Sequence, residues 1–259
     1  MNRRQFVESA LAGSLAAGIP ARLKAMDDKR KYVTLEWYRT RRDLDTTRLR
    51  DFLSDILTPA LNRAGIKPVG LFQVSIGPDS PSFLVVAPFP SMGAIQESQA
   101  RLAGDGKWTD AQAAFDDKWE LAYERREAVL LQTFQSIPDL ETPKPASGKN
   151  SIFELRQYES RNLLGHTKKV AMFDNGEIAI FRRVGINPVF FGSTVFGPRM
   201  PNLIYMVSFP SLEARSESWT KFGQDPEWKR ISTAPGSTDK ELVSSISNQI
   251  LTPLAASQI

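Results

Sequence analysis

The two halves of the chain repeat one pattern of hydrophobic and polar positions. In the second half, strict alternation predicts strands, and apolar side chains at helical spacing predict helices. Six elements are predicted there, in the order strand, helix, strand, strand, helix, strand: residues 152–158, 162–183, 188–196, 203–209, 211–222 and 245–254. Ser211 is a good helix cap, and the Gly197-Pro198 pair marks the turn of a hairpin.

Shifting the sequence by 120 residues brings the first half onto the second. Residues 32–108 then align with residues 152–228 without a gap, and about 20 of about 77 positions are identical. The matches gather at Gly, Pro and aromatic positions, where backbone geometry is restrictive. A helix at 109–125 and a strand near 128–134 are predicted to complete the first half. We interpret this as a tandem repeat.

Four segments follow from this comparison. We predict an export leader at residues 1–26, an N-terminal domain at 30–135, a Pro-rich linker at 136–150 and a C-terminal domain at 151–259. Each domain has the βαββαβ order of a ferredoxin-like unit, whose helices cover only one face of its sheet. The fold class is therefore α+β, with two ferredoxin-like repeats closing an intramolecular dimeric α/β-barrel.

The second half resembles the NIPSNAP family. The residues that carry the resemblance are the opening strand Phe153-Glu154-Leu155-Arg156-x-Tyr158, the strands that follow it, and Leu212-x-Ala214-Arg215 with Asp225-Pro226-Glu227-Trp228. The first half is a degenerate copy, because Thr34-Leu35-Glu36-Trp37-Tyr38 lacks the Glu-Leu-Arg order. The resemblance implies a dimeric α/β-barrel, a fold shared with small monooxygenases and haem-handling enzymes. It does not imply one reaction.

The first residues are typical of a twin-arginine export leader. Arg3 and Arg4 are followed by Phe6 and an Ala/Gly-rich apolar stretch that is too short to span a membrane as a mature helix. An amphipathic N-terminal helix with two incidental arginines is the alternative interpretation. The leader predicts a periplasmic or extracellular protein with no stable membrane span in the mature chain.

Composition narrows the possible chemistry. The chain of 259 residues has no cysteine and one histidine, which excludes thiolate sites, disulfides and multi-histidine metal centres, so no metal is predicted. Its net charge is +4, of which residues 1–26 hold +3, leaving +1 on the mature chain. A nearly neutral chain gives no electrostatic reason to bind nucleic acid.

Candidate ligand-binding residues lie on the first strand of each repeat. Alternation places Glu154, Arg156 and Tyr158 on one face, and Glu36 and Tyr38 on the matching face of the first half. We expect the apolar face to pack on the helices and this polar face to line the barrel lumen. The polar residues could hold a ligand or transfer a proton; a satisfied interior ion pair is the alternative.

His166 is a further candidate, at the start of the first helix of the second half. It could act as a base or as a haem ligand, and a helix cap or a surface residue is the alternative. No cofactor motif accompanies it, so no cofactor is predicted. Catalytic residues are not identified by the sequence.

The predicted function is that of an exported protein binding a small apolar or mixed-polarity ligand in the barrel lumen. A non-enzymatic scaffold and a cofactor-poor monooxygenase are the alternatives. The chain is also a candidate homodimer.

Overall fold

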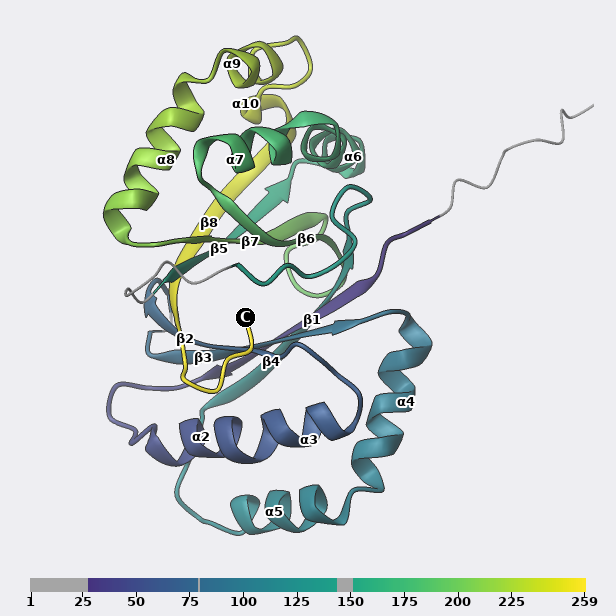
Figure 1. Ribbon diagram of the computed structural model, residues 1–259, viewed down its shortest axis with the longest axis vertical. Coiled ribbons are helices and arrows are strands. Elements are labelled where there is room, and N and C mark those ends of the chain that lie inside the picture. The colour runs from purple at the N-terminus through teal and green to yellow at the C-terminus, as the bar shows by residue number, and fades with distance from the viewer. Residues whose placement is uncertain (1–27, 79, 144–150) are drawn as a thin grey trace, which may run out of the picture.

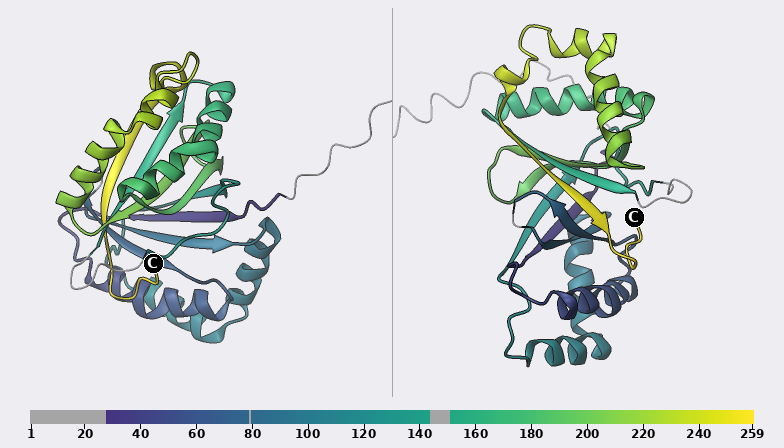
Figure 2. Two further views of the ribbon diagram at one scale, coloured as in Figure 1. Left: turned by 45° about the horizontal axis from the view of Figure 1, so that its top comes forward. Right: turned by 90° about the vertical axis from the view of Figure 1, so that its left-hand side faces the viewer.

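The structure is a computed structural model that describes residues 28–78, 80–143 and 151–259. The predicted leader at 1–26 and residues 144–150 of the predicted linker lie outside the described residues. Within the described residues, the chain forms one eight-stranded barrel with helices on two opposite sides (Figures 1 and 2).

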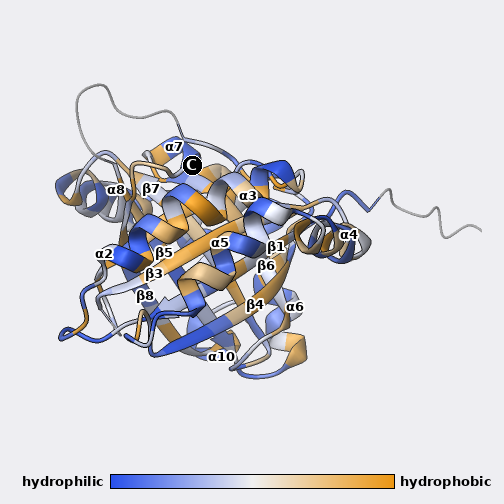
Figure 3. Ribbon diagram, turned by 90° about the horizontal axis from the view of Figure 1, so that it is seen from below, coloured by the Kyte–Doolittle hydropathy of each residue, from blue (hydrophilic) through white to orange (hydrophobic). Residues whose placement is uncertain are grey.

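The N-terminal repeat supplies four of the strands and one group of helices. Its elements are β1 (Tyr32–Arg39), α2 (Thr47–Asp51), the π-helical segment η1 (Phe52–Leu57), α3 (Thr58–Arg63), β2 (Gly70–Ile76), β3 (Ser82–Phe89), α4 (Met92–Ala103), α5 (Gly106–Asp116) and β4 (Arg125–Thr133). Seen from below, α2, α3 and α5 lie across the strands of this repeat and carry both polar and apolar positions (Figure 3).

The C-terminal repeat supplies the other four strands. Its elements are β5 (Ile152–Ser160), α6 (Leu163–Met172), the π-helical segment η2 (Phe173–Glu177), α7 (Ile178–Val184), β6 (Asn187–Phe196), β7 (Asn202–Phe209), α8 (Leu212–Gln224), α9 (Pro226–Ser232), α10 (Asp239–Leu242) and β8 (Val243–Pro253). Ser211 caps α8 by accepting a hydrogen bond from the backbone N–H of Ala214, as Ser91 does for Ala94 in α4.

The two repeats close the barrel by pairing their edge strands. Each repeat has the antiparallel order of a ferredoxin-like sheet, β4-β1-β3-β2 and β8-β5-β7-β6. The sheets join where β2 pairs with β8 and where β4 pairs with β6, with Gln132 opposite Ser193 in the second seam. Because the barrel is closed, each of the eight described strands has a neighbouring strand on both sides. The predicted fold class is confirmed.

The assignment of strand faces is wrong, however. The apolar set on β1 and β5, including Leu35, Phe153 and Leu155, points into the lumen and forms one core cluster with residues from all eight strands. Glu154 and Tyr158 lie on the outer face, beneath the helices. The reason is that a closed barrel buries both faces of its sheet, so alternation separates the faces without telling which one is the lumen.

One helix is also shorter than predicted. The helix expected at 109–125 ends at Asp116, and residues from Arg125 onward form β4, which pairs with β1 along its whole length. Residues 117–124 form the connection from α5 to β4 and lie in neither a helix nor a strand. Arg125 itself belongs to β4, where pairing with β1 satisfies its backbone hydrogen bonds.

Candidate functional site

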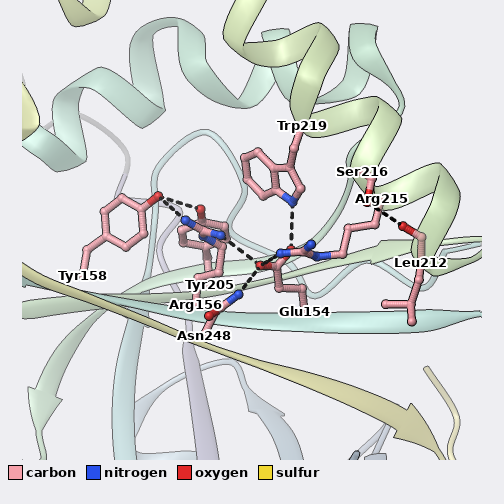
Figure 4. Close-up of polar contacts among 9 residues, drawn as sticks. All are labelled: Glu154, Arg156, Tyr158, Tyr205, Leu212, Arg215, Ser216, Trp219 and Asn248. Atoms are coloured by element: carbon pink, nitrogen blue, oxygen red, sulfur yellow. Dashed lines mark hydrogen bonds and ion pairs between the residues drawn. The ribbon is translucent and has the colours of Figure 1, made fainter. Parts of the chain in front are cut away.

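Glu154 lies beneath the helices of the C-terminal repeat and has no exposed surface (Figure 4). Arg215 of α8 forms a two-point ion pair with it, with nitrogen–oxygen distances of 2.7 and 2.8 Å. The indole N–H of Trp219, one helical turn further along α8, donates to the same carboxylate at 2.8 Å. Helical spacing therefore places two donors of α8 over one residue of β5.

Two strands complete the shell of donors around Glu154. Arg156 donates from β5 at 2.9 Å, and Asn248 donates from β8 at 2.9 Å. The carboxylate thus accepts five hydrogen bonds. Burial alone would raise the pKa of Glu154, but these hydrogen bonds and charges together hold the pKa below its ordinary value.

Arg156 links this carboxylate to a pair of tyrosines. Its guanidinium lies 4.7 Å from the ring centre of Trp219 and donates to the hydroxyl of Tyr158 at 3.2 Å. The hydroxyl of Tyr205 donates in turn to that of Tyr158 at 3.1 Å. Burial and the neighbouring Tyr158 raise the pKa of Tyr205, so the phenol stays protonated near neutral pH.

This cluster, formed by Glu154, Arg156, Arg215, Trp219 and Asn248, has the properties of a structural element. An ionised carboxylate whose oxygens already accept five hydrogen bonds is poorly suited to remove a proton from a ligand. The alternative interpretation of the strand pattern, a satisfied interior ion pair, describes this geometry. Glu154, Arg156 and Tyr158 are brought together as predicted, but beneath the helices and not in the lumen.

His166 lies apart from this cluster. It is on α6, half-buried, with Nδ1 3.3 Å from the hydroxyl of Ser160 and Nε2 3.0 Å from the hydroxyl of Ser193. Burial lowers its pKa, so the neutral imidazole is favoured. In this position His166 connects α6 to β5 and β6, and the residue that caps α6 is Asn162 instead.

A buried ion pair beneath the same helices was not anticipated from the sequence. The ammonium of Lys169 lies 3.3 Å from Glu177 and 3.3 Å from Asp239, and both Lys169 and Glu177 are almost fully buried. Burial raises the pKa of Glu177 to about 7, against the opposing effect of Lys169. Lys169 and Glu177 are eight residues apart, about two helical turns, and this spacing is the one sequence signal that could have placed both on the same face of a helix.

In the N-terminal repeat, Glu36 and Tyr38 occupy the matching outer face of β1. Glu36 forms an ion pair with Arg126 of β4 at 2.6 Å, and the Arg126 guanidinium lies 5.6 Å from the ring centre of Tyr38. Burial raises the pKa of Tyr38, and the nearby Glu36 acts in the same direction. These two predicted residues lie together, on the wall of a cavity.

The cavity lies between the strands and the helices of the N-terminal repeat and has a volume of about 180 Å³. Its walls are mostly apolar, and its polar groups gather near Glu36 and Arg126. The lining residues are Thr34, Glu36, Tyr38, Leu57, Leu61, Ile66, Val85, Ala87, Phe89, Ile95, Ser98, Gln99, Leu102, Trp108, Gln112 and Arg126. We call this the N-terminal cavity.

The comparison of the two repeats explains why this space is open in the N-terminal repeat. Where the C-terminal repeat has large or charged side chains, the N-terminal repeat has smaller ones at the positions 120 residues earlier. The pairs are Thr34 for Glu154, Val85 for Tyr205, Ile95 for Arg215 and Gln99 for Trp219. The cluster that fills the C-terminal repeat is therefore absent from the N-terminal cavity.

The described residues form neither a clustered metal site nor a membrane-spanning helix. No group of three or more His, Cys, Asp or Glu side chains is placed to hold a metal ion in the part of the chain that the structure describes. No helix among the described residues has the length and apolar character needed to cross a membrane.

Several solved structures share the fold. A proposed monooxygenase of Fusobacterium nucleatum is 9% identical, with a TM-score of 0.59 over 86% of this chain and 92% of its own. One from Lactobacillus acidophilus is 11% identical, with a TM-score of 0.58 over 86% and 93%. An anthrone oxidase-like protein is 14% identical, with a TM-score of 0.51 over 88% and 92%. At these identities the likeness shows the fold alone.

Comparison at the level of sequence families is more specific. A search of curated proteins finds no match to this chain. The NIPSNAP family model, in contrast, matches two segments, residues 43–135 and 153–258, which together make up most of the sequence. The chain therefore belongs to the NIPSNAP family.

Proposed function

We propose that this protein binds a small organic molecule, and that the N-terminal cavity is the binding site. The observation that carries the proposal is the difference between the two repeats. One helix–sheet interface is closed by the Glu154 cluster, and the other has kept a largely apolar space of about 180 Å³. Binding sites for small molecules have this character, with apolar walls and a few polar groups that fix orientation.

The walls indicate the kind of molecule that fits. Leu57, Leu61 and Phe89 offer apolar surface, while Glu36 with Arg126 presents a paired charge at one side. A neutral or weakly polar compound fits both the apolar walls and the ion pair, because its apolar body contacts the walls and its polar group can hydrogen-bond to Glu36 or Arg126. This corresponds to the small ligand of mixed polarity expected from the sequence, at a site outside the barrel lumen.

We propose ligand binding and no chemical reaction. The alternative of a cofactor-poor monooxygenase rests on likeness of fold alone, and fold does not determine reaction. The alternative of a scaffold without a ligand is decided by the experiment below. Export through the twin-arginine-type leader is proposed on the residues of the leader alone, and a homodimer stays a prediction that the native mass would test.

The test uses Val85→Tyr, which places in the N-terminal cavity the side chain found at the equivalent position 205. Native mass spectrometry of the protein purified from its own host should show a bound molecule, and the V85Y protein should lose it. Ala87→Leu fills the same space from the neighbouring position on the outer face of β3 and serves if V85Y folds poorly.

The tryptophans give an independent readout in solution. Trp108 lines the N-terminal cavity, whereas the side chain of Trp119 is almost fully exposed. On addition of indole, the side-chain N–H signal of Trp108 should shift and saturate, and that of Trp119 should not. A protein that carries no bound molecule and a Trp108 signal that indole leaves unchanged would favour the scaffold.

A further inference from the structure

A second cavity lies inside one end of the barrel. Its volume is about 220 Å³, and inward-facing residues of both repeats line it, among them Trp37 and Val129 from the first and Leu155 and Gln249 from the second. The rest of the lumen is filled by the apolar core, so this lumen-end cavity is a pocket and not a channel. It is separated from the N-terminal cavity by the sheet itself.

Both repeats contribute residues to this cavity at equivalent positions, 120 residues apart in the sequence. Strand register confirms the correspondence, because Trp37 lies opposite Glu127 as Gln157 lies opposite Ser247. Four pairs of equivalent positions line the cavity: Trp37 with Gln157, Pro78 with Pro198, Glu127 with Ser247 and Val129 with Gln249. The cavity therefore lies near the approximate two-fold axis that relates the two repeats.

Only one of those four pairs is chemically the same. Two identical subunits would have to present identical groups around such an axis. A single chain is free of this constraint, and here the aromatic Trp37 corresponds to the amide Gln157, and the apolar Val129 corresponds to the amide Gln249. At these two pairs the first repeat contributes an aromatic and an apolar side chain, and the second contributes two amides. The rest of the lining is mixed, with Arg39 and Glu127 on the first side and Leu155 on the second.

Two buried polar atoms on neutral side chains of the lining lack a hydrogen-bond partner among the described residues. They are the indole N–H of Trp37, a residue only 6% exposed, and the side-chain carbonyl oxygen of Gln249. A buried donor or acceptor without a partner is unfavourable, so a molecule that satisfies it gains affinity. One atom needs an acceptor and the other needs a donor.

The charges near the cavity are already paired. Arg39 donates to Glu127 at 2.9 Å, and its guanidinium lies 5.3 Å from the ring centre of Trp37. Arg199 lies 3.9 Å from Glu159. With each charge next to an opposite one, the cavity favours a neutral molecule over an ion.

We propose that the lumen-end cavity is a second binding site, for a neutral aromatic molecule that carries a hydrogen-bond acceptor and a donor, such as an aromatic amide. The ring lies on the side of Trp37 and Val129, the acceptor receives the indole N–H of Trp37, and the donor reaches Gln249. Because the two sides differ, the molecule binds in one orientation. The site is independent of the N-terminal cavity.

Benzamide is the probe, because its carbonyl and amino groups supply the acceptor and the donor. Toluene is the comparison, since it has the ring without either group. In spectra of the tryptophan side-chain N–H groups, the Trp37 signal is identified by its loss in Trp37→Phe. Benzamide should shift this signal until it saturates, while Trp108 reports separately on the N-terminal cavity.

The matched variant is Gln249→Met, which keeps the length of the side chain and removes the acceptor. It should weaken benzamide binding about tenfold, the effect of one lost buried hydrogen bond, and leave toluene binding unchanged. V85Y should leave the Trp37 response intact. Unchanged signals of Trp219 and Trp228 verify that Q249M is folded.

Two results would overturn the proposal. In the first, neither probe moves the Trp37 signal, which would mean that water alone occupies the cavity. In the second, Q249M binds benzamide as tightly as the unmodified protein does, which would mean that the unpartnered oxygen plays no part. Either result leaves the proposal for the N-terminal cavity standing, because that site is read through Trp108.

Discussion

The substitution Glu154→Gln removes one charge from the centre of the buried cluster in the C-terminal repeat. The amide has the shape of the carboxylate but only one acceptor oxygen, and its NH₂ group faces the donors that surround it. Arg215 and Arg156, whose side chains are 23% and 17% exposed, then lose the carboxylate that neutralises them. We expect a stability defect without a change in the strand order.

The expected magnitude follows from the burial of both partners. Breaking a buried ion pair by removing one partner costs about 3–5 kcal/mol. For a protein of this size, each kcal/mol corresponds to a change of about 2–4 °C in the melting temperature, so the E154Q protein should melt roughly 6–20 °C lower.

The chain offers its own control in the other repeat. Glu36→Gln makes the same chemical change on β1, but the partner side chain, Arg126, is 54% exposed. A pair open to solvent contributes about 0–1 kcal/mol, so E36Q should melt within a few degrees of the unmodified protein.

The assay is urea unfolding of the three proteins at pH 7, followed by the fluorescence of the tryptophans. A difference of less than about 1 kcal/mol between E154Q and the unmodified protein would refute the reasoning, because it would place Glu154 in the class of exposed pairs. A loss in E36Q as large as that in E154Q would refute it as well.

Two further predictions follow from the same residues and from the leader. The pKa of Glu154 is lowered in the folded state, so the ionised carboxylate stabilises the fold at pH values above 4.5, its ordinary pKa. This stabilisation is lost as the pH falls through the lowered pKa, so the difference in unfolding free energy between E154Q and the unmodified protein should narrow in acid. A difference that widens in acid would contradict the assignment. Changing Arg3 and Arg4 together to lysine should leave the precursor in the cytoplasm, as cell fractionation would show, and normal export of that double variant would argue against a twin-arginine leader.

Much of the fold could be predicted from the sequence, because the same sequence pattern occurs twice in the chain. The matched Gly, Pro and aromatic positions at a shift of 120 define the βαββαβ order twice, and that order restricts the sheet to few arrangements. The direction of the faces could not be predicted in this way. In a closed barrel Leu155 and Glu154 are both buried, one in the lumen and one beneath α8.

The candidate site was predicted only in part, because the residues that contact Glu154 and Arg156 come from distant segments of the chain. Glu154, Arg156 and Tyr158 do lie together, but their environment is set by Arg215 and Trp219, about 60 residues further along the chain. The open cavity depends on what the N-terminal repeat lacks at the equivalent positions. A position-by-position comparison of the repeats contains that signal, as in Gln99 against Trp219.

The central claim is that one chain closes its own barrel from two repeats, and the lumen-end cavity, which residues of both repeats line, depends on it. Because the sequence has no cysteine, a pair placed across the β4–β6 seam, Gln132→Cys with Ser193→Cys, gives an unambiguous readout. The account predicts that oxidation links the two cysteines within one chain, so the cross-linked species migrates as a monomer under denaturing, non-reducing conditions. Cross-linking only between chains, or none, would contradict it.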